Sequence, residues 1–230
     1  MNIPARQASV LSPMAVGRYL DASGERQALP YSALESERST RSLLKVLNTF
    51  EFSMGSNLLI TALFDQGVQA LGMERAVMQF NMVAVSADSS LFDARRVESI
   101  IRLFPLAGAY GITAATLDGL AGLGHDPLKL FAGMVVWAWP DAYERLAGQP
   151  GIRVFRCLEV GPALAVECSA AAGAHIDRFE WAIDTVDGEV VLSSRLERCQ
   201  AFHHYHTGLR GQVLHGVCSC GSTDPRIVPA

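Results

Sequence analysis

The sequence predicts an α+β fold in which an N-terminal helical layer, residues about 39–148, packs on a C-terminal antiparallel sheet, residues about 152–218. Three observations lead to this prediction. Apolar residues recur at helical spacing through the first part of the chain. After Gly151 the repeat of apolar residues changes from about 3.6 to about 2, which is the period of a strand. Asp187 and Gly188 form a two-residue hairpin signal between two alternating segments.

The sequence predicts a flexible N-terminal arm over residues 1–38 and a single α+β domain over residues 39–230. The arm mixes Ser, Ala, Arg, Glu and Pro without a sustained period, apart from one short helix expected around Met14–Tyr19.

Several helices are expected after the arm. Ser42–Phe50 and Leu58–Leu71 carry apolar residues at helical spacing, and Asn57 is a suitable cap for the second of these helices. Further helices are expected from Ser90 to Arg102 and from Ala114 to Ala121. The alternation over Val77–Val85 favours a strand, although a helix stays open there.

The segment from Asp126 to Trp139 predicts a central core helix. Asp126 can cap a helix whose first turn contains Pro127, and the following residues are apolar on nearly every side. A short helix from Ala142 to Ala147 is expected next.

The C-terminal third predicts antiparallel strands. Residues 153–159 and 163–168 read as two strands joined at Gly161 and Pro162. The hairpin at Asp187 and Gly188 places Trp181 opposite Ser194 and Glu180 opposite Arg195. With this register most apolar partners share one face and opposite charges share the other, and a shift by one residue would lose both matches.

Composition limits the classes of protein that fit. Half of the 230 residues are apolar and 18% are charged, which supplies a core and argues against global disorder. The net charge of −4 gives no reason to expect nucleic acid as a partner. The longest apolar stretch has about ten residues, whereas a membrane span needs about 20. A small-molecule ligand, a protein partner or a homo-oligomer stays compatible with this composition.

Cysteine usage and the N-terminus indicate a cytoplasmic location. The chain has five cysteines, an odd number that fits a reducing compartment. The first ten residues lack the apolar segment of a signal peptide.

The most unusual local feature is a group of histidines and cysteines near the C-terminus. Four of the six histidines fall within residues 203–215, and two cysteines follow at once. His204 and His206 would share one face of a strand, with Cα atoms about 7 Å apart. The sequence therefore predicts a metal site, for Zn²⁺ or Fe²⁺. Its candidate ligands are His204, His206, His215, Cys218 and Cys220.

The same residues also fit roles that need no metal. The spacing matches no zinc-finger pattern, and the histidines could simply be half-exposed polar residues on the solvated face of a sheet. One histidine could instead act in acid–base chemistry. Cys157 and Cys168 lie among apolar neighbours, which is typical of cysteines that fill a core.

Two function hypotheses follow, and the sequence does not decide whether the protein is an enzyme. The leading hypothesis is a small metal-binding protein or metal-dependent enzyme that uses the His-x-His pair on a strand. The alternative is a non-catalytic module without metal that binds a small ligand or a peptide, in a groove between the layers or along an open sheet edge. The chain has no Walker loop, no Gly-x-Ser-x-Gly elbow and no His-Glu-x-x-His motif.

Overall fold

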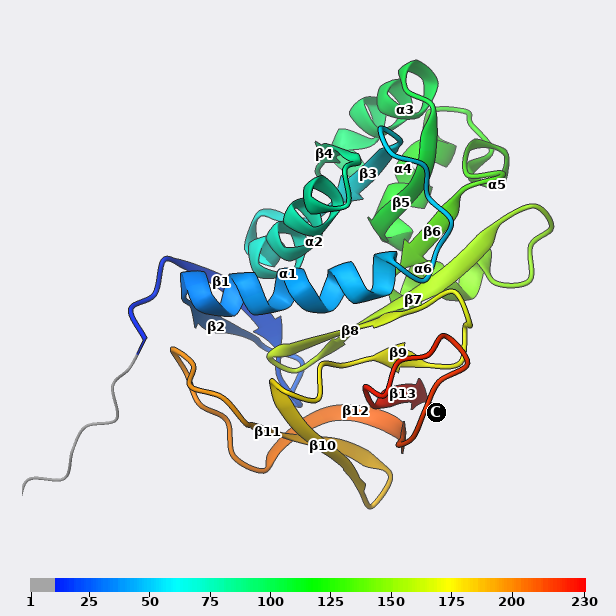
Figure 1. Ribbon diagram of the computed structural model, residues 1–230. Coiled ribbons are helices and arrows are strands. Elements are labelled where there is room, and N and C mark those ends of the chain that lie inside the picture. Colours follow the sequence, from blue (N-terminus) through cyan, green and yellow to red (C-terminus); the bar gives the residue numbers. More distant parts are fainter. Residues whose placement is uncertain (1–10) are drawn as a thin grey trace, which may run out of the picture.

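The structure is a computed structural model that describes residues 11–230 (Figure 1). In this part of the chain, eleven strands form one mixed sheet in the order β10-β11-β12-β13-β9-β8-β7-β6-β5-β3-β4, beside a separate hairpin of β1 and β2. The prediction of a helical layer on an antiparallel sheet is therefore right only for the C-terminal third. The first two-thirds alternate strands with helices, so the fold is α/β with a large mixed sheet.

The N-terminal hairpin lies within the predicted arm, whose first ten residues are outside the described part. Strands β1 (Ala15–Leu20) and β2 (Arg26–Tyr31) pair antiparallel and lead into helix α1 (Ala33–Leu47). The short helix expected around Met14–Tyr19 is wrong, because β1 exposes alternate residues and buries Tyr19 in the core. A reciprocal capping box between Ser32 and Glu35 starts α1 earlier than the periodicity predicted.

A doubly wound region follows the hairpin, and its strands are parallel to one another. Its elements are β3 (Asn57–Thr61), η1 (Phe64–Gln66), α2 (Gly67–Gln79), β4 (Val83–Ala87), η2 (Leu91–Asp93), α3 (Ala94–Leu103), β5 (Leu106–Ile112), α4 (Ala114–Gly122), α5 (Pro127–Leu130), β6 (Val135–Ala138), α6 (Pro140–Leu146) and β7 (Arg153–Val160).

Helices cover both faces of the parallel strands. In β6, Val135 and Trp137 belong to the core formed with α1 and α2, whereas Val136 and Ala138 belong to the core formed with α3 and α4. All four residues of β6 are buried. A strand that is buried on both faces is apolar at every position and shows no alternation.

This double burial explains two wrong element predictions. The expected core helix from Asp126 to Trp139 is a four-residue helix, α5, followed by β6. A short continuous apolar run cannot be assigned by its period, because it fits a buried strand and a buried helix equally well. The helix expected over Leu58–Leu71 is wrong for the same reason, because its first residues form β3, whose side chains are buried in both cores.

The segment Val77–Val85, where alternation favoured a strand and a helix stayed open, has a different outcome. It contains the end of α2 and the start of β4, with a turn at Asn81 between them.

The antiparallel region begins where β8 pairs with β7. Its strands are β8 (Ala163–Glu167), β9 (Ala174–His175), β10 (Trp181–Val186), β11 (Glu189–Ser194), β12 (Tyr205–Leu214) and β13 (Arg226–Pro229). The predicted hairpin is confirmed, with Trp181 opposite Ser194. The predicted strands around Gly161 and Pro162 are also confirmed as β7 and β8.

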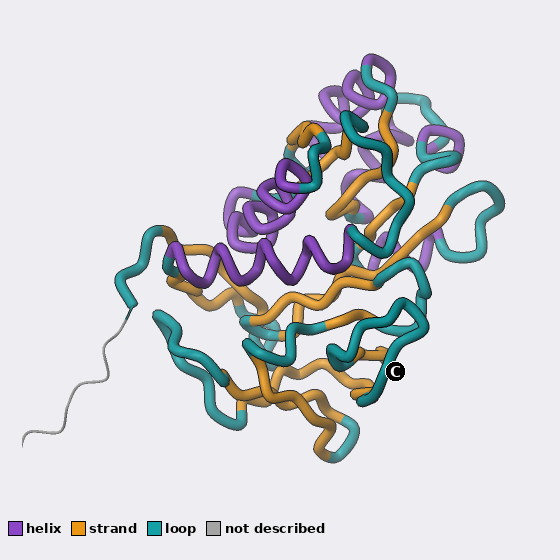
Figure 2. The backbone as a smooth tube through the Cα atoms, viewed as in Figure 1, coloured by secondary structure: helices purple, strands orange, loops and turns teal. Residues whose placement is uncertain are grey.

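The narrowest part of the sheet is β9. This strand has two residues, Ala174 and His175, and it pairs with β8 on one side and with β13 on the other, through two residue pairs each. In Figure 2 the helices lie with the parallel strands, and the antiparallel region, made of orange strands and teal loops, projects below them. The sheet therefore continues into the outer strands β10–β13 through a short seam, which we call the β9 seam.

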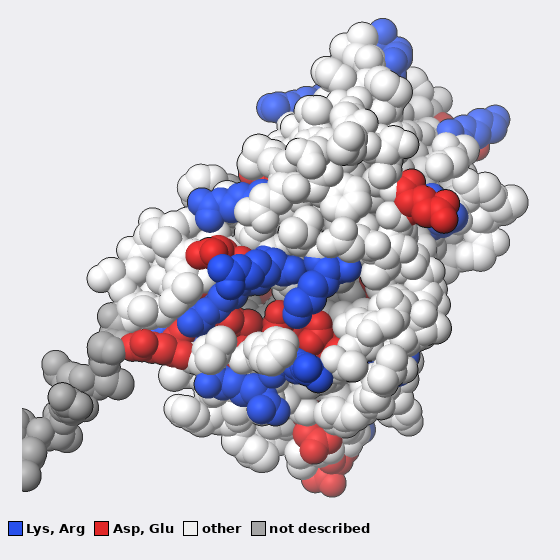
Figure 3. Space-filling model, in the orientation of Figure 1, with Lys and Arg blue, Asp and Glu red and all other residues white. Residues whose placement is uncertain are grey.

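Ion pairs also join α1 to the antiparallel region. Buried Arg198 pairs with Glu35 of α1 and with Glu180, at 3.1 and 2.7 Å. Arg38 reaches Glu180 at 3.2 Å, so Glu180 pairs with these arginines across the interface. Figure 3 shows blue and red side chains gathered in a band across the middle of this face, where α1 crosses the strands in Figure 1.

Among residues 11–230, no helix is both long enough and apolar enough to cross a membrane.

Candidate functional site

A cavity of about 820 Å³ opens at the carboxyl ends of the parallel strands. In a doubly wound sheet this edge binds ligands, at the point where the strand order reverses. Here the order reverses between β3 and β5, because β4 extends the sheet on one side of β3 and β5 extends it on the other. The lining residues are Leu20, Asp21, Ala22, Gly24, Arg26, Leu63, Gln66, Ser89, Ser90, Leu91, Thr113, Ala115, Trp139, Pro140, Asp141, Leu158, Glu159, Thr207, Gly208 and Leu209.

The turn between β1 and β2 forms one wall of the cavity, and Asp21 holds its shape. The Asp21 carboxylate accepts hydrogen bonds from the Ser23 hydroxyl at 2.6 Å, the Glu25 backbone N–H at 3.0 Å and the Gln27 amide at 2.7 Å. The bond from Ser23 and then that from Glu25 lower the pKa of Asp21 to about 2. The turn is therefore ordered by its own bonds.

Strand β12 closes against this turn from the opposite side. Gly208 has a φ of +75°, and a Cβ at this position would lie 2.8 Å from the Cα of Ala22. Only glycine allows this approach without a shift of the backbone. The wall of the cavity therefore joins the first and the last thirds of the chain.

The charges that line the cavity are unequal in number. Arg26 is the one cationic side chain among the lining residues, and Asp21, Asp141 and Glu159 are carboxylic acids. Glu159 accepts a hydrogen bond from the Leu20 backbone N–H at 2.7 Å and lies 3.7 Å from Arg26. Burial raises the pKa of Glu159 above its ordinary value, against the opposing effects of Leu20 and Arg26.

Two residues of the wall have polar atoms without a partner in the described structure. The indole nitrogen of Trp139 and the hydroxyl oxygen of Ser89 are buried and make no hydrogen bond. A buried donor without a partner costs about 1–3 kcal/mol, and such groups are often completed by a ligand or a water molecule.

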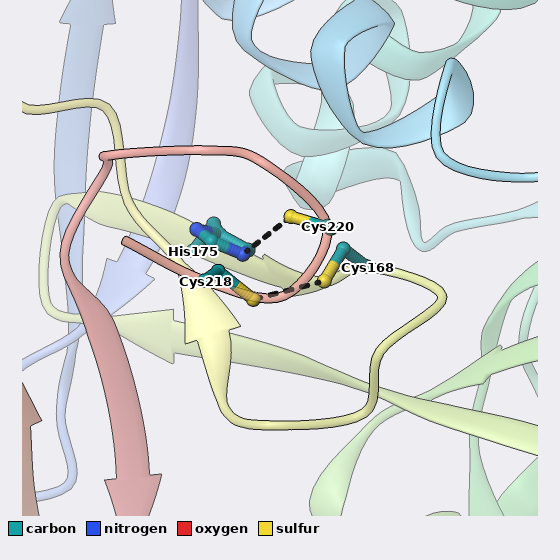
Figure 4. A group of neighbouring side chains, drawn as sticks. All are labelled: Cys168, His175, Cys218 and Cys220. Carbon is teal, nitrogen blue, oxygen red and sulfur yellow. Dashed lines mark hydrogen bonds between the residues drawn. The ribbon is translucent and has the colours of Figure 1, made fainter. Parts of the chain in front are cut away.

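A second group of reactive side chains lies at the β9 seam, apart from the cavity lining. Figure 4 shows Cys168, His175, Cys218 and Cys220 directed toward one another from the end of β8, from β9 and from the loop before β13. Their ligand atoms all lie within 4.8 Å of one another. We call these four residues the seam cluster.

The structure divides the five metal ligands predicted from the sequence. Cys218 and Cys220 belong to the seam cluster, whereas His204, His206 and His215 lie outside it. His204 and His206 are exposed neighbours with ring centroids 5.6 Å apart, and His206 contacts the Glu189 carboxylate at 3.0 Å. His204 precedes β12 and has a φ of +47°, so the two histidines are not successive residues of one strand face.

Cys168 and His175 were not among the predicted ligands. Cys168 was assigned to the core because of its apolar neighbours, and both residues are indeed buried. The spacing between Cys168, His175 and the later cysteines has no fixed value in a ligand motif, so proximity appears only in the fold. The Cys-x-Cys pair is the sequence signal that could have prompted a search for distant partners.

The fold is similar to that of acyl-CoA ligases. A 2-hydroxyisobutyryl-CoA ligase, solved in the postadenylation state with 2-HIB-AMP, superposes with a TM-score of 0.68 over 94% of this chain and 52% of its own, at 14% identity. E. coli MenE, solved with an analogue of OSB-AMS, gives a TM-score of 0.55 over 96% of this chain and 50% of its own, also at 14% identity.

A putative long-chain-fatty-acid CoA ligase from Rhodopseudomonas palustris CGA009 gives a TM-score of 0.55 at 14% identity, over 97% of this chain and 61% of its own. This chain thus spans roughly half to three-fifths of these ligases. No protein-family model matches it, and a comparison with curated proteins finds no match.

These comparisons overturn the functional hypotheses drawn from the sequence. A small metal-binding protein or metal-dependent enzyme built on a His-x-His pair is wrong, and so is its alternative, a non-catalytic binding module. The chain instead has the fold of ligases that were solved with acyl adenylates, adenylate analogues or CoA. The neighbours bind small molecules, in agreement with the predicted class of partner.

Proposed function

We propose that the cavity at the carboxyl ends of the parallel strands is the adenylate site of an enzyme that activates a carboxylic acid. In this reaction a carboxylate oxygen bonds to the α-phosphorus of ATP, and the bond from that phosphorus to pyrophosphate breaks. The products are an acyl adenylate and pyrophosphate. The observation that carries the proposal is the position and size of the cavity, at the switch point of a sheet shared with acyl-CoA ligases.

The side chains of the wall suit an acyl adenylate. Arg26 can pair with the single negative charge of its phosphate group, and arginine binds phosphate oxygens through two parallel N–H groups. Leu63, Leu91 and Leu158 offer apolar surface for an acyl chain or a base. Trp139 and Ser89 supply donors that have no partner within the protein.

The same side chains fit a free triphosphate less well. Three carboxylic acids and one arginine line the cavity, so an ATP molecule needs its divalent cation to enter. Asp21 already accepts bonds from its own turn, and Asp141 accepts bonds from the backbone N–H groups of Ala114 and Ala142. The protein groups thus favour the adenylate over ATP alone.

Calorimetric titration with 5′-O-(N-acetylsulfamoyl)adenosine, a stable mimic of an acyl adenylate, tests the proposal. We expect saturable binding to the unmodified chain, stronger than that of AMP. Arg26→Gln is expected to weaken binding about tenfold or more, because one charge-assisted contact contributes about 1.5–3 kcal/mol. Arg95→Gln, an exposed position on α3 away from the cavity, serves as the matched control and should bind normally.

Exchange of labelled pyrophosphate into ATP, measured over a panel of carboxylic acids, tests the reaction itself. Exchange that depends on one acid and falls in Arg26→Gln supports the proposal. The proposal would be contradicted if the mimic showed no saturable binding and no acid supported exchange.

A further inference from the structure

Two distances within the seam cluster match those of a tetrahedral metal site, and all four ligand atoms lie within 4.8 Å of one another. The Sγ atoms of Cys168 and Cys218 are 3.8 Å apart, and the Sγ atom of Cys220 is 3.6 Å from Nε2 of His175. Around one Zn²⁺ with bonds of about 2.3 Å to sulfur and 2.0–2.1 Å to nitrogen, a regular tetrahedron places two sulfurs about 3.8 Å apart. The same tetrahedron places sulfur and nitrogen about 3.6 Å apart.

Cys168 and Cys218 are not joined by a disulfide. A disulfide bond is about 2.05 Å long, whereas the sulfurs of Cys168 and Cys218 are 3.8 Å apart. All five cysteines are free thiols. Three thiols and one imidazole that meet in a mostly buried place are a soft donor set, which suits Zn²⁺.

The imidazole of His175 is oriented as a ligand. Its Nδ1 lies 3.1 Å from the backbone carbonyl oxygen of Asp224, and a carbonyl can only accept a hydrogen bond. Nδ1 therefore carries the proton, and Nε2 presents its lone pair toward Cys220. Metal-binding histidines usually have such a partner on the nitrogen that does not bind the metal.

Two backbone turns present the thiols. In the first, the Ala171 N–H donates to the Cys168 carbonyl at 3.0 Å. In the second, the Gly221 N–H donates to the Cys218 carbonyl, and the Cys218 N–H donates to the Ser222 carbonyl, both at 2.8 Å. The second turn needs a φ of +90° at Gly221, where glycine is favoured. Cys218 and Cys220 are thereby folded back toward one point (Figure 4).

The cluster also lies where a cross-link would matter most to the fold. Cys168 follows β8, His175 belongs to β9, and the other two thiols precede β13. These are the three strands of the β9 seam, which otherwise hold together through two residue pairs on each side. None of the four side chains lines the large cavity.

We propose that Cys168, His175, Cys218 and Cys220 bind one Zn²⁺ that fastens the β9 seam. The three thiols release their protons to solvent on binding, and the four ligands leave no open position for a reacting molecule. The ion is structural, and the proposed adenylate chemistry takes place elsewhere.

Elemental analysis of the full chain, purified without a histidine tag, tests the proposal. We expect about one zinc per chain in the unmodified protein. The double variant Cys218→Ser/Cys220→Ser should lose nearly all of it. Cys199→Ser, a cysteine outside the cluster, is the matched control for a lost thiol, and His204→Ala/His206→Ala is the control for lost histidines. Both controls should keep their zinc.

A second measurement does not depend on whether a variant folds. The unmodified protein is stripped of metal with a chelator under reducing conditions and titrated with Co²⁺. We expect the intense visible absorption of tetrahedral thiolate-bound Co²⁺, saturating at one ion per chain and removed by an equivalent of Zn²⁺. Zinc well below one per chain together with no Co²⁺ spectrum would overturn the proposal. Iron in place of zinc, or zinc lost in the His204→Ala/His206→Ala control, would also overturn it.

Discussion

The parallel and antiparallel regions of the sheet are stabilised in different ways. The parallel strands β3, β5 and β6 are buried on both faces by helices, and large apolar side chains fill the two cores. The antiparallel strands β10–β13 have a core on one side, a two-residue seam to the rest of the sheet, and ion pairs to α1. Two helix-covered cores thus secure the first region, whereas the second combines one apolar core with a short seam and a few specific polar contacts. The following predictions test this difference, from the largest expected effect to the smallest.

The largest effect is expected where the two modes of stabilisation meet, at Trp137. Its side chain is fully buried beside Phe50 and Phe155, and its indole N–H donates to the Glu167 carbonyl of β8 at 2.9 Å. Trp137→Ala should lower the free energy of unfolding by about 3–5 kcal/mol. Urea denaturation measures this loss, with exposed Phe64→Ala as a control expected to change stability by less than about 0.5 kcal/mol. A loss below about 1 kcal/mol at Trp137 would contradict this account of the core.

Removal of the buried Arg198 guanidinium should lower the free energy of unfolding almost as much as Trp137→Ala does. Arg198→Met leaves Glu35 and Glu180 buried without their shared partner, which should cost about 3–5 kcal/mol. The loss should concentrate in the antiparallel region, so hydrogen exchange of β10 and β11 should accelerate more than that of β3 and β5. Equal acceleration in both regions would show that the arginine does not attach one region to the other.

The two glutamates of this network should respond differently to loss of charge. Burial opposes the charged form of Glu35, but hydrogen bonds from Ser32 and Cys199 and the charge of Arg198 outweigh it and lower the pKa. Burial instead raises the pKa of Glu180, although Arg198 and Arg38 oppose this. At pH 7, Glu35→Gln should therefore cost about 1.5–3 kcal/mol and Glu180→Gln clearly less.

The pH dependence of stability gives a second test of the same pair. A lowered folded-state pKa means that the contribution of Glu35 is present above about pH 4.5 and is lost as the pH falls through that lower pKa. The raised pKa of Glu180 favours its protonated form, so its contribution is present below about pH 4.5 and is lost as the pH rises through the folded pKa. The free energy of unfolding of the unmodified chain minus that of each glutamine variant, measured between pH 3 and 7, should show these opposite slopes.

The smallest effect is expected at Lys45. Its ammonium group lies 3.1 Å from Asp177 and 3.2 Å from Asp224, but its side chain is 44% exposed. Lys45→Met should therefore lower the free energy of unfolding by about 0.5–1 kcal/mol. The loss should be smaller at high salt, because salt screens exposed ion pairs. Thermal unfolding at low and high ionic strength measures this difference. A loss of stability as large as that of Arg198→Met would mean that burial does not explain the difference between the Lys45 and Arg198 ion pairs.

The sequence was informative where local chemistry decides the structure. Asp187 and Gly188 force the hairpin turn, and the alternation on either side of the turn sets the register, so that element could be predicted in detail. The parallel strands could not, because Val135–Ala138 is buried on both faces and lacks the alternation that identifies a strand. The fold class was therefore right for the antiparallel third and wrong for the rest.

The sites were harder to predict because their parts are far apart in the chain. Cys218 and Cys220 were found because they follow the group of histidines, but Cys168 is 50 positions before Cys218 and looks like a core residue. The cavity takes its wall from the first hairpin, from the ends of the parallel strands and from β12. No short motif contains these residues, and the histidines that do stand together are exposed.

The contact between Gly208 and Ala22 has a consequence for the order of events during synthesis. The β1–β2 turn leaves the ribosome early, and the parallel strands follow, but the opposing wall arrives only when residues 207–209 have emerged. A nascent chain that has made everything up to β11 still has an open pocket, and its apolar surface is exposed to other chains. A pause in translation before β12 would thus prolong the exposure of this apolar surface and favour aggregation. A pause after β12 would not, because the pocket is then already enclosed.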